Sequence, residues 1–264
     1  MIKTAIPPIG FGLWQNRDKA ECIQAVLWAL AAGYRHFDTA QIYQNEQYLG
    51  MALKTSGLRR NELFITSKIH LKNYPRRKLH LSTIDSLHKL QTDYIDLLLL
   101  HFPLPVLRKN AWLELEEVAK LGYARAIGVS NYTIRHLEQL KTYAHITPAV
   151  NQVELHVYLQ QPELLAYCRE NGILVEAYSP LAHGRGLDDP VLAEIGRKYG
   201  KSPTQVMLRW CIEQDTIPLP KSTHQDRIAQ NIDIFDFKLD GGDMERLRSL
   251  NKNLRTCWSP VHVP

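Results

Sequence analysis

The stretch Ile95-Asp96-Leu97-Leu98-Leu99-Leu100-His101 decides the fold class, because it is an almost continuous apolar run that ends on a polar residue. Strands that are apolar on both faces are typical of parallel sheets that are covered on both sides. Seven further short apolar runs, rich in β-branched or aromatic residues, recur along the chain. Together they predict eight strands, at Ile9–Trp14, Tyr34–Asp38, Leu63–Lys68, Ile95–His101, Ala124–Ser130, Ala149–Glu154, Ile173–Ser179 and Thr216–Lys221.

Amphipathic stretches long enough to form helices lie between most of these runs. Pro162 and Pro203 fall in opening helical turns, and Gly33, Gly172 and Gly200 directly follow helix ends, which is where each residue type is favoured. The predicted helices span Arg17–Ala32, Glu46–Ser56, Pro75–Gln91, Asn110–Leu121, Ile134–Tyr143, Gln161–Asn171, Pro190–Tyr199, Pro203–Glu213, Gln225–Ile232 and Gly242–Leu250. The alternation of strands and helices therefore predicts repeated βαβ units.

Eight such units in 264 residues match the usual size of a (β/α)8 barrel, so we predict a single α/β TIM-barrel domain over residues 1–264. No linker, block of like charge or internal repeat divides the chain. A Rossmann domain needs GxGxxG in its phosphate turn, and Gly10-Phe11-Gly12-Leu13-Trp14-Gln15 lacks the third glycine. Walker A, HExxH and GxSxG motifs are also absent, so the common phosphoryl-transfer and hydrolase signatures find no support.

Composition excludes several classes of protein. With 45% apolar and 22% charged residues, the chain has ample material for a core. No apolar run reaches about 18 residues, and Met1-Ile2-Lys3-Thr4 leads into Pro7-Pro8 without the apolar segment of a signal peptide, so we expect a cytoplasmic protein with no membrane partner. The four cysteines are too far apart for a CxxC motif and no histidine pair has ligand spacing, so we expect reduced thiols and no metal.

The net charge of +5 and the pI near 8.9 favour an anionic ligand. The basic residues are nevertheless scattered, and Arg76-Arg77-Lys78 is the one run among them. A solvated helix face explains that run more simply than a nucleic-acid patch does, so we expect no nucleic-acid partner. We also expect a monomer.

Polar residues at the C-terminal ends of barrel strands are the first candidates for an active site, because the sites of such barrels lie there. Asp38 ends the second predicted strand, Tyr43 follows five residues later, Lys68 ends the third strand and His101 the fourth. Each has an ordinary alternative: an ion pair or helix cap, a loop aromatic, a surface lysine and a hydrogen-bonded strand end. Together they predict a site, since a phenol beside a buried Lys–Asp pair should have a lowered pKa and could protonate a carbonyl oxygen.

These residues lie in motifs that resemble the aldo-keto reductase family over essentially the whole chain. The matching stretches are Gly33-Tyr34-Arg35-His36-Phe37-Asp38-Thr39-Ala40, Ile65-Thr66-Ser67-Lys68, Asp93-Tyr94-Ile95-Asp96-Leu97, His101-Phe102-Pro103, Gly128-Val129-Ser130-Asn131, Asn151-Gln152, Tyr178-Ser179-Pro180-Leu181 and Pro220-Lys221-Ser222. Asp38-Thr39-Ala40-Gln41-Ile42-Tyr43 and the short length look most like bacterial 2,5-diketo-gluconate and methylglyoxal reductases. The resemblance implies NADPH-dependent reduction of an aldehyde or ketone, with a small polar carbonyl compound as substrate.

Carried over to this sequence, the resemblance implies that Tyr43 is the proton donor, that Lys68 paired with Asp38 lowers the pKa of Tyr43, and that His101 orients the carbonyl. Tyr178 would stack on the nicotinamide ring, although a packing residue at the barrel mouth is an alternative. The residues implied to bind NADPH are Ser130, Asn131, Gln152, Tyr178, Ser179 and Leu181 around the nicotinamide, and Lys221, Ser222, Thr223, Arg227, Gln230 and Asn231 around the 2′-phosphate and adenine.

The segment 221–227 predicts an anion site from its own residues, because it carries two cations and two hydroxyls around a helix start with free N–H groups. A solvated basic helix start is the alternative. The resemblance implies that Lys221 and Arg227 grip the 2′-phosphate and that Gln230 and Asn231 contact adenine.

Three positions depart from the family pattern: Phe102 stands where many relatives carry Trp, Leu13 replaces a common Thr, and Gln230 replaces a common Glu. The connection 101–110 and the tail after residue 250 are short, which favours an open pocket for small polar carbonyl compounds. The candidate apolar walls of that pocket are Trp14, Phe102 and Trp258, for which an exposed tryptophan or a core aromatic is the alternative.

Two other functions remain open at this point. The first is a regulatory barrel that binds the cofactor with little turnover, like the β subunits of potassium channels. The second is a Schiff-base lyase with Lys68 as the nucleophile, against which Tyr43, Asp38 and the NADPH-like site argue.

Overall fold

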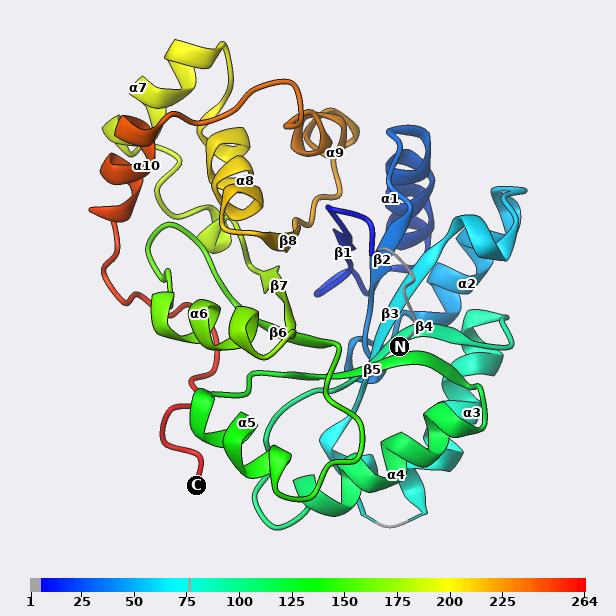
Figure 1. Ribbon diagram of the computed structural model, residues 1–264. Helices are drawn as coiled ribbons and strands as arrows, with labels where there is room; N and C mark the ends of the chain where they lie inside the picture. Colours follow the sequence, from blue (N-terminus) through cyan, green and yellow to red (C-terminus); the bar gives the residue numbers. More distant parts are fainter. Residues whose placement is uncertain (1–5, 76) are drawn as a thin grey trace.

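The computed structural model describes residues 6–75 and 77–264. Residues 1–5, and with them the start Met1-Ile2-Lys3-Thr4, lie outside these ranges, as does Arg76 of the basic run. Eight parallel strands follow one another in chain order (Figure 1). They are β1 (Phe11–Gly12), β2 (His36–Asp38), β3 (Phe64–Ile69), β4 (Ile95–Leu100), β5 (Ala124–Ser130), β6 (Val150–Glu154), β7 (Leu174–Tyr178) and β8 (Thr216–Leu219). The predicted (β/α)8 barrel is thereby confirmed.

Two backbone hydrogen bonds bring the last strand against the first. Gly10 N donates to Pro218 O at 3.0 Å and Gly12 N donates to Pro220 O at 2.9 Å. These contacts join the segments around β8 and β1, so the sheet curls into a barrel and its strand ends gather at two rims.

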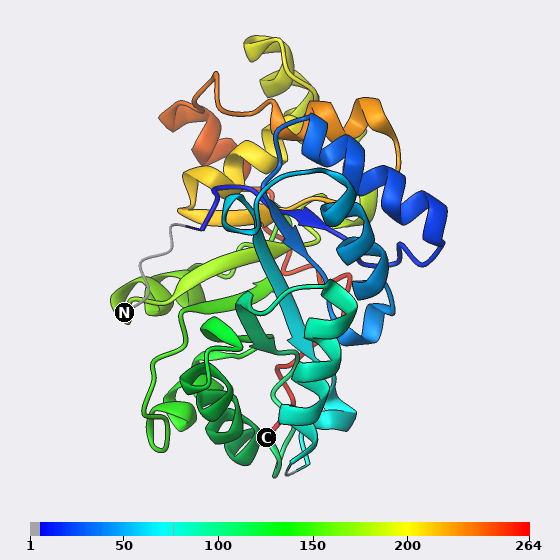
Figure 2. The same ribbon diagram turned by 90° about the vertical axis from the view of Figure 1, so that its right-hand side faces the viewer.

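The helices surround the strands, as the turned view shows (Figure 2). Pro162, Pro190 and Pro203 each occupy the first helical turn, and Gly200 ends its helix at a φ of 66°, a conformation that glycine adopts without strain. The helices are α1 (Lys19–Ala31), α2 (Glu46–Thr55), α3 (Lys78–Leu90), α4 (Arg108–Lys120), α5 (Ile134–Lys141), α6 (Pro162–Glu170), α7 (Pro190–Tyr199), α8 (Pro203–Glu213), α9 (Gln225–Ile232) and α10 (Gly241–Arg248).

Several strands are shorter than the apolar runs that predict them. The run Ile9–Trp14 yields the two-residue β1, because the chain turns after Gly12, where Asn16 N donates to Leu13 O and Gln15 takes a φ of 62°. Apolar residues beyond the ends of a strand still pack in the core, so hydrophobicity alone overestimates strand length.

The barrel interior has an apolar and a polar part. Phe64, Leu97, Leu99 and Val150 form an inner apolar cluster, against which Ile6 packs. The polar side chains buried in the interior are His36, Asp38, Thr66, Lys68, Gln152 and Glu176. Because side chains alternate along a strand, the inward positions 64, 66 and 68 of β3 pass from a ring to a hydroxyl to an ammonium.

The chain after α10 runs past α6 and ends near α5 (Figure 1, red). The backbone N–H groups of Thr256 and Cys257 donate to the carboxylate of Glu154, which ends β6, at 2.6 and 3.2 Å. Further on, Val263 O lies 2.9 Å from His136 Nε2, on α5. The C-terminal segment is therefore fastened to the same rim that carries the predicted site.

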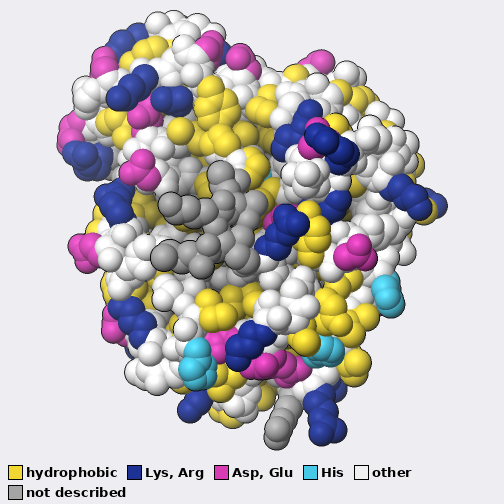
Figure 3. Space-filling view, turned by 45° about the vertical axis from the view of Figure 1, so that its right-hand side comes forward, with side chains coloured by type: hydrophobic (Ala, Val, Ile, Leu, Met, Phe, Trp, Pro, Cys, Tyr) yellow, Lys and Arg dark blue, Asp and Glu magenta, His cyan; other side chains and the backbone are white. Residues whose placement is uncertain are grey.

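The outer surface mixes charges of both signs. On the face in Figure 3, Lys and Arg side chains are interspersed with Asp and Glu. Among residues 6–75 and 77–264, no helix combines the length and apolar character needed to cross a membrane.

Candidate active site

The four residues predicted to form the catalytic group meet at one point of the C-terminal rim. Asp38 is the last residue of β2, Tyr43 ends the short helix η1 (Gln41–Tyr43), Lys68 is the penultimate residue of β3, and His101 directly follows β4. Lys68 Nζ donates to Asp38 Oδ1 at 2.6 Å and lies 3.4 Å from Tyr43 Oη. The rings of Tyr43 and His101 stand edge to face, with centroids 5.8 Å apart. The structure thus brings together all four side chains.

A network of side chains fixes the loop that carries Tyr43. Thr39 Oγ1 donates to Asn45 Oδ1 at 2.6 Å, and Asn45 Nδ2 donates to Leu13 O at 2.8 Å. Gln41 bridges to α3 through a hydrogen bond from its Nε2 to Ser86 Oγ at 3.0 Å. Because these bonds span both ends of the loop, the phenol is held in place by the protein itself.

Burial and neighbouring charges together determine the charge states of this group. Burial raises the pKa of Tyr43 above its ordinary value, and the nearby Lys68 ammonium opposes this shift without overcoming it. The expected net lowering of the Tyr43 pKa is therefore wrong, although Lys68 acts in the expected direction. Burial also acts to lower the pKa of Lys68, but Asp38 and Tyr43 outweigh it, and the net shift is upward. Lys68 is charged at neutral pH and Tyr43 holds its proton.

His101 is neutral at physiological pH. Burial, followed by the charge of Lys68, lowers its pKa to about 3. A neutral imidazole can donate or accept a hydrogen bond but is not a cationic acid. His101 is therefore suited to orienting a carbonyl oxygen.

Four of the residues implied to bind the nicotinamide end form one hydrogen-bonded group. Tyr178 Oη donates to Asn131 Oδ1 at 2.7 Å, and Asn131 Nδ2 donates to Ser130 Oγ at 3.0 Å. Ser130 Oγ in turn donates to the backbone oxygen of Gln152 at 2.9 Å. Asn131 takes a φ of 65°, which asparagine tolerates better than most residues. The ring of Tyr178, half-buried at the end of β7, is thereby fixed at the rim.

Ser179 and Leu181 follow Tyr178 in a turn of unusual backbone geometry. Ser179 takes a φ of 49°, and its hydroxyl lies 3.2 Å from His183 Nε2. Leu181 is half-buried and packs against the main core. Both residues lie next to Tyr178 on the rim, as predicted from their motif.

The predicted phosphate site lies between β8 and α9. Ser222 is buried, whereas Lys221 and Arg227 are exposed, and neither cation forms an ion pair with any residue that the structure describes. His224 precedes the first turn of α9 without capping it through its side chain. Thr223 is half-buried, Gln230 is exposed, and Asn231 is buried on the same helix. This arrangement leaves two cations and free helix N–H groups available to an anion.

Two of the three candidate pocket walls lie together. Phe102 and Trp258 stand edge to face with ring centroids 6.4 Å apart, although Trp258 is 72% exposed. Trp14 instead packs edge to face on His183, at 5.2 Å. The aromatic pair 102–258 therefore adjoins His101, and Trp14 belongs to a separate contact with the turn after β7.

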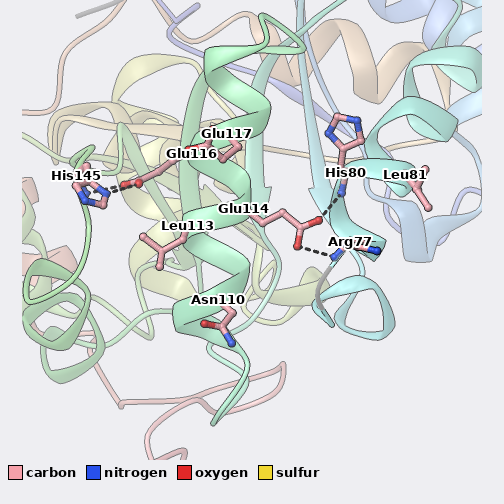
Figure 4. Close-up of a pocket in the computed structure, with 9 residues that line it drawn as sticks. All are labelled: Arg77, His80, Leu81, Asn110, Leu113, Glu114, Glu116, Glu117 and His145. Atoms are coloured by element: carbon pink, nitrogen blue, oxygen red, sulfur yellow. Dashed lines mark hydrogen bonds and ion pairs between the residues drawn. The ribbon is translucent and has the colours of Figure 1, made fainter.

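A sizeable pocket lies elsewhere, on the outer surface between α3 and α4 (Figure 4). Its polar side chains serve structural contacts: Glu114 accepts from the backbone N–H groups of Arg77 and His80, each at 3.1 Å, and Glu116 pairs with His145 at 2.9 Å. None of the catalytic candidates lines it.

Sequence reasoning passed over two buried carboxyl groups at the site. Glu176 accepts from Gln152 Nε2 at 2.8 Å, and Glu154 binds the C-terminal segment. Glu176 had a recognisable signal, since it is a charged residue inside the apolar stretch 174–178, two positions before Tyr178 and therefore on the same face. Among the described residues, no group of three or more His, Cys, Asp and Glu side chains is arranged to hold a metal ion.

Comparison with models of known families identifies the family of this protein. The model of the aldo/keto reductase family matches residues 8–252, almost the whole chain. The chain belongs to the aldo/keto reductase family. It is accordingly an NADP-dependent oxidoreductase that acts on carbonyl groups.

Named relatives of this aldo/keto reductase cover nearly its full length. The glyoxal reductase of Bacillus subtilis (strain 168) is 44% identical over 97% of this chain and 92% of its own. The methylglyoxal reductase DkgA of Escherichia coli (strain K12) is 41% identical over 97% of this chain and 93% of its own. Among solved structures, a Bombyx mori aldo-keto reductase in complex with NADP is 38% identical and superimposes with a TM-score of 0.90 over 95% of this chain and 91% of that one.

The residues of this aldo/keto reductase fit the NADP(H) cofactor. Both hydrogens of Gln152 Nε2 are used inside the barrel, and no hydrogen bond from a described residue reaches its Oε1, which leaves an acceptor for the carboxamide. Lys221 and Arg227 stand exposed beside a helix start, as a 2′-phosphate requires. The chain thus offers a hydrogen-bond acceptor for the carboxamide end of the cofactor and two cations for its phosphate end.

Proposed function

We propose that this enzyme reduces small polar carbonyl compounds, such as methylglyoxal or a diketo-sugar acid, with Tyr43 as the proton donor. The observation that carries the proposal is the contact of Tyr43 Oη with Lys68 Nζ at 3.4 Å, where Lys68 itself pairs with Asp38 at 2.6 Å. The glyoxal and methylglyoxal reductases among the relatives support the substrate class.

When bound, NADPH supplies the hydride. Tyr43 donates its phenolic proton to the carbonyl oxygen, and Lys68 stabilises the phenolate that this leaves. Asp38 keeps the ammonium of Lys68 in place, and the neutral imidazole of His101 orients the oxygen by a hydrogen bond. Because Asp38 and Lys68 are buried and already paired, little reorganisation is needed at the moment of proton transfer.

The same proposal assigns cofactor contacts. Ser130, Asn131 and Gln152 hold the carboxamide and Tyr178 supports the ring, with Ser179 and Leu181 beside it. Lys221 and Arg227 bind the 2′-phosphate together with Ser222 and Thr223, and Gln230 and Asn231 contact adenine. The exposure of both cations and the fixed ring of Tyr178 support this division.

The substrate would sit between His101 and the aromatic pair Phe102 and Trp258, with Trp14 at the edge of the opening. The high exposure of Trp258 supports an open pocket that selects weakly for large apolar groups.

A panel of carbonyl compounds tests the function. The purified protein is assayed for NADPH consumption with methylglyoxal, 2,5-diketo-gluconate and aromatic aldehydes, and the alcohol products are quantified. We expect one alcohol per NADPH and the highest kcat/KM for one of the small polar compounds. Tight NADPH binding without turnover of any member of the panel would instead favour a regulatory barrel.

A further inference from the structure

A second carboxyl group shares a hydrogen-bond donor with Asp38 inside the barrel. Glu176, on β7, is fully buried, and its Oε2 accepts from Gln152 Nε2 at 2.8 Å. The same nitrogen donates to Asp38 Oδ2 at 2.8 Å. An amide NH2 group has two hydrogens, so Gln152 uses both to join the two carboxyl groups.

The other oxygen of Glu176 faces an imidazole without bonding to it. Among the described residues, Glu176 Oε1 has no hydrogen-bond partner, and His36 Nε2 lies 3.7 Å away, hydrogen-bonded to Thr66 Oγ1 at 2.9 Å. Gly10 leaves room for the imidazole of His36, because a Cβ at position 10 would lie 2.7 Å from His36 Nδ1. Glu176 Oε1 is thus buried without a hydrogen bond from any described residue.

The titratable groups around Glu176 lie on β2, β3 and β6. Asp38 and His36 lie on β2 and Lys68 on β3, while Glu154 of β6 is engaged with the backbone of the C-terminal segment. Burial lowers the pKa of His36 to about 3, so it offers no positive charge at neutral pH. Lys68 is already paired with Asp38.

A proton on Glu176 follows from these surroundings. Burial, and then the charge of Asp38, raise the pKa of Glu176 to about 8. Two buried carboxylates that share one donor repel each other, so Glu176 is neutral at pH 7 and ionises within the range of an ordinary assay.

We propose that Glu176 is a positioning residue for carbonyl reduction: through Gln152 it orients the Asp38 carboxylate that holds Lys68, and its ionisation weakens Tyr43 as an acid. The inference rests on the proposed function, since it requires Lys68 and Tyr43 to serve proton transfer. When Glu176 loses its proton to solvent, a second negative charge is added beside Asp38. That charge favours the protonated phenol, which then gives up its proton less readily.

Ionisation of Glu176 makes the rate of reduction depend on pH. Below the pKa of Glu176 the group is neutral and reduction runs at its full rate. Above that pKa the rate declines, although Tyr43 still holds its proton, because the pKa of Tyr43 lies above its ordinary value.

The test compares kcat and KM for methylglyoxal from pH 6 to 9.5 in the wild type, Glu176→Gln, Glu176→Ala and a control, Glu46→Gln. Glu46 is another buried glutamate, which accepts from Ser67 and Ser86 and forms no hydrogen bond with Gln152 or Asp38. Glutamine keeps an acceptor for Gln152 but cannot ionise. We expect Glu176→Gln to retain kcat at pH 7 within about threefold and to move the alkaline decline upward by about one pH unit or more.

Alanine removes the acceptor, so we expect kcat at pH 7 to fall about tenfold with KM nearly unchanged, and glutamine to rescue it. An unshifted Glu176→Gln profile, or an equal shift in Glu46→Gln, would overturn the inference even if the alanine variant does not fold. An inactive Tyr43→Phe variant beside an unshifted Glu176→Gln profile would contradict the inference alone. A fully active Tyr43→Phe variant would contradict the proposed function, and the inference with it.

Discussion

Two regions of the C-terminal rim differ in the burial and ion pairing of their cationic side chains. Between β2 and β4, Lys68 is almost fully buried and already bonded to Asp38 and to the backbone oxygen of Thr39, at 2.6 and 2.9 Å. Between β8 and α9, Lys221 and Arg227 are exposed and, within the part of the chain that the structure describes, form no ion pair.

The difference fits the roles that we propose for the two regions. A buried ammonium without a partner is costly, so the proton-transfer region satisfies its own charges and keeps a fixed geometry. An exposed cation costs little while free, and it gains a charge-assisted hydrogen bond when a phosphate arrives. We therefore expect substitutions in the first region to change the rate of reduction and those in the second to change cofactor affinity.

A large separation between rate and affinity should come from Lys68→Met, in the first of these two regions. Without the ammonium, Tyr43 loses the charge that favours its phenolate, and we expect kcat to fall by about 10²–10³-fold. The dissociation constant of NADPH, measured by fluorescence titration, should stay within a few-fold.

Lys68→Met also leaves Asp38 buried without its cation, which can destabilise the fold. The double variant Lys68→Met/Asp38→Asn removes that unpaired charge. It should regain thermal stability and remain slow, and recovery of the rate in the double variant would show that the ammonium has no part in proton transfer.

A smaller effect of the opposite kind is expected for Arg227→Ala. Loss of one charged hydrogen bond, about 1.5–3 kcal/mol, should weaken NADPH binding roughly ten- to a hundredfold and leave NADH binding nearly unchanged. Arg197→Ala, an exposed arginine on α7, serves as the control. Equal losses for NADPH and NADH would remove the 2′-phosphate from this region.

The smallest effect on the rate of reduction should come from Glu154→Gln. Glu154 binds the C-terminal segment, which lies on the rim between the two regions. Burial acts to raise the pKa of Glu154, but hydrogen bonds from His156 and Thr256 outweigh it and lower the pKa to about 2. The Glu154 carboxylate therefore stabilises the attached C-terminal segment above pH about 4.5, and this stabilisation is lost as the pH falls toward 2.

Hydrogen–deuterium exchange measures how strongly Glu154 fastens the C-terminal segment. In Glu154→Gln we expect faster exchange at the amides of Thr256 and Cys257, with kcat changed by no more than about threefold. Unchanged exchange at both amides would mean that Glu154 does not fasten the segment.

The sequence predicted the fold well because its signals are local and repeated. Gly200 marks the end of α7 and Pro203 the start of α8, and the predicted bounds of both helices match the structure to the residue. The strand Ile9–Trp14 was overestimated, since the turn at Gln15 depends on contacts with β2 that no local pattern reveals.

The site was predictable as a set of residues but not as an electrostatic system. The motif around Asp38 and Tyr43 predicted which side chains meet, whereas the pKa of Tyr43 depends on how deeply the phenol is buried, which only the packed structure supplies. Glu176 was missed for a related reason, because its importance comes from a hydrogen bond to Gln152 on the neighbouring strand.

The central claim is that Tyr43 gives the proton, while Lys68 stabilises the phenolate and Asp38 and His101 position the reacting groups. Tyr43→Phe tests it most directly, with Tyr123→Phe, just before β5 at the opposite end of the barrel, as the matched control. Carbonyl reduction in Tyr43→Phe should fall by about 10²–10⁴-fold or more, with NADPH affinity within a few-fold of the wild type and the control fully active. Reduction of methylglyoxal by Tyr43→Phe at near wild-type rate would contradict the account and move the search for the acid to another group.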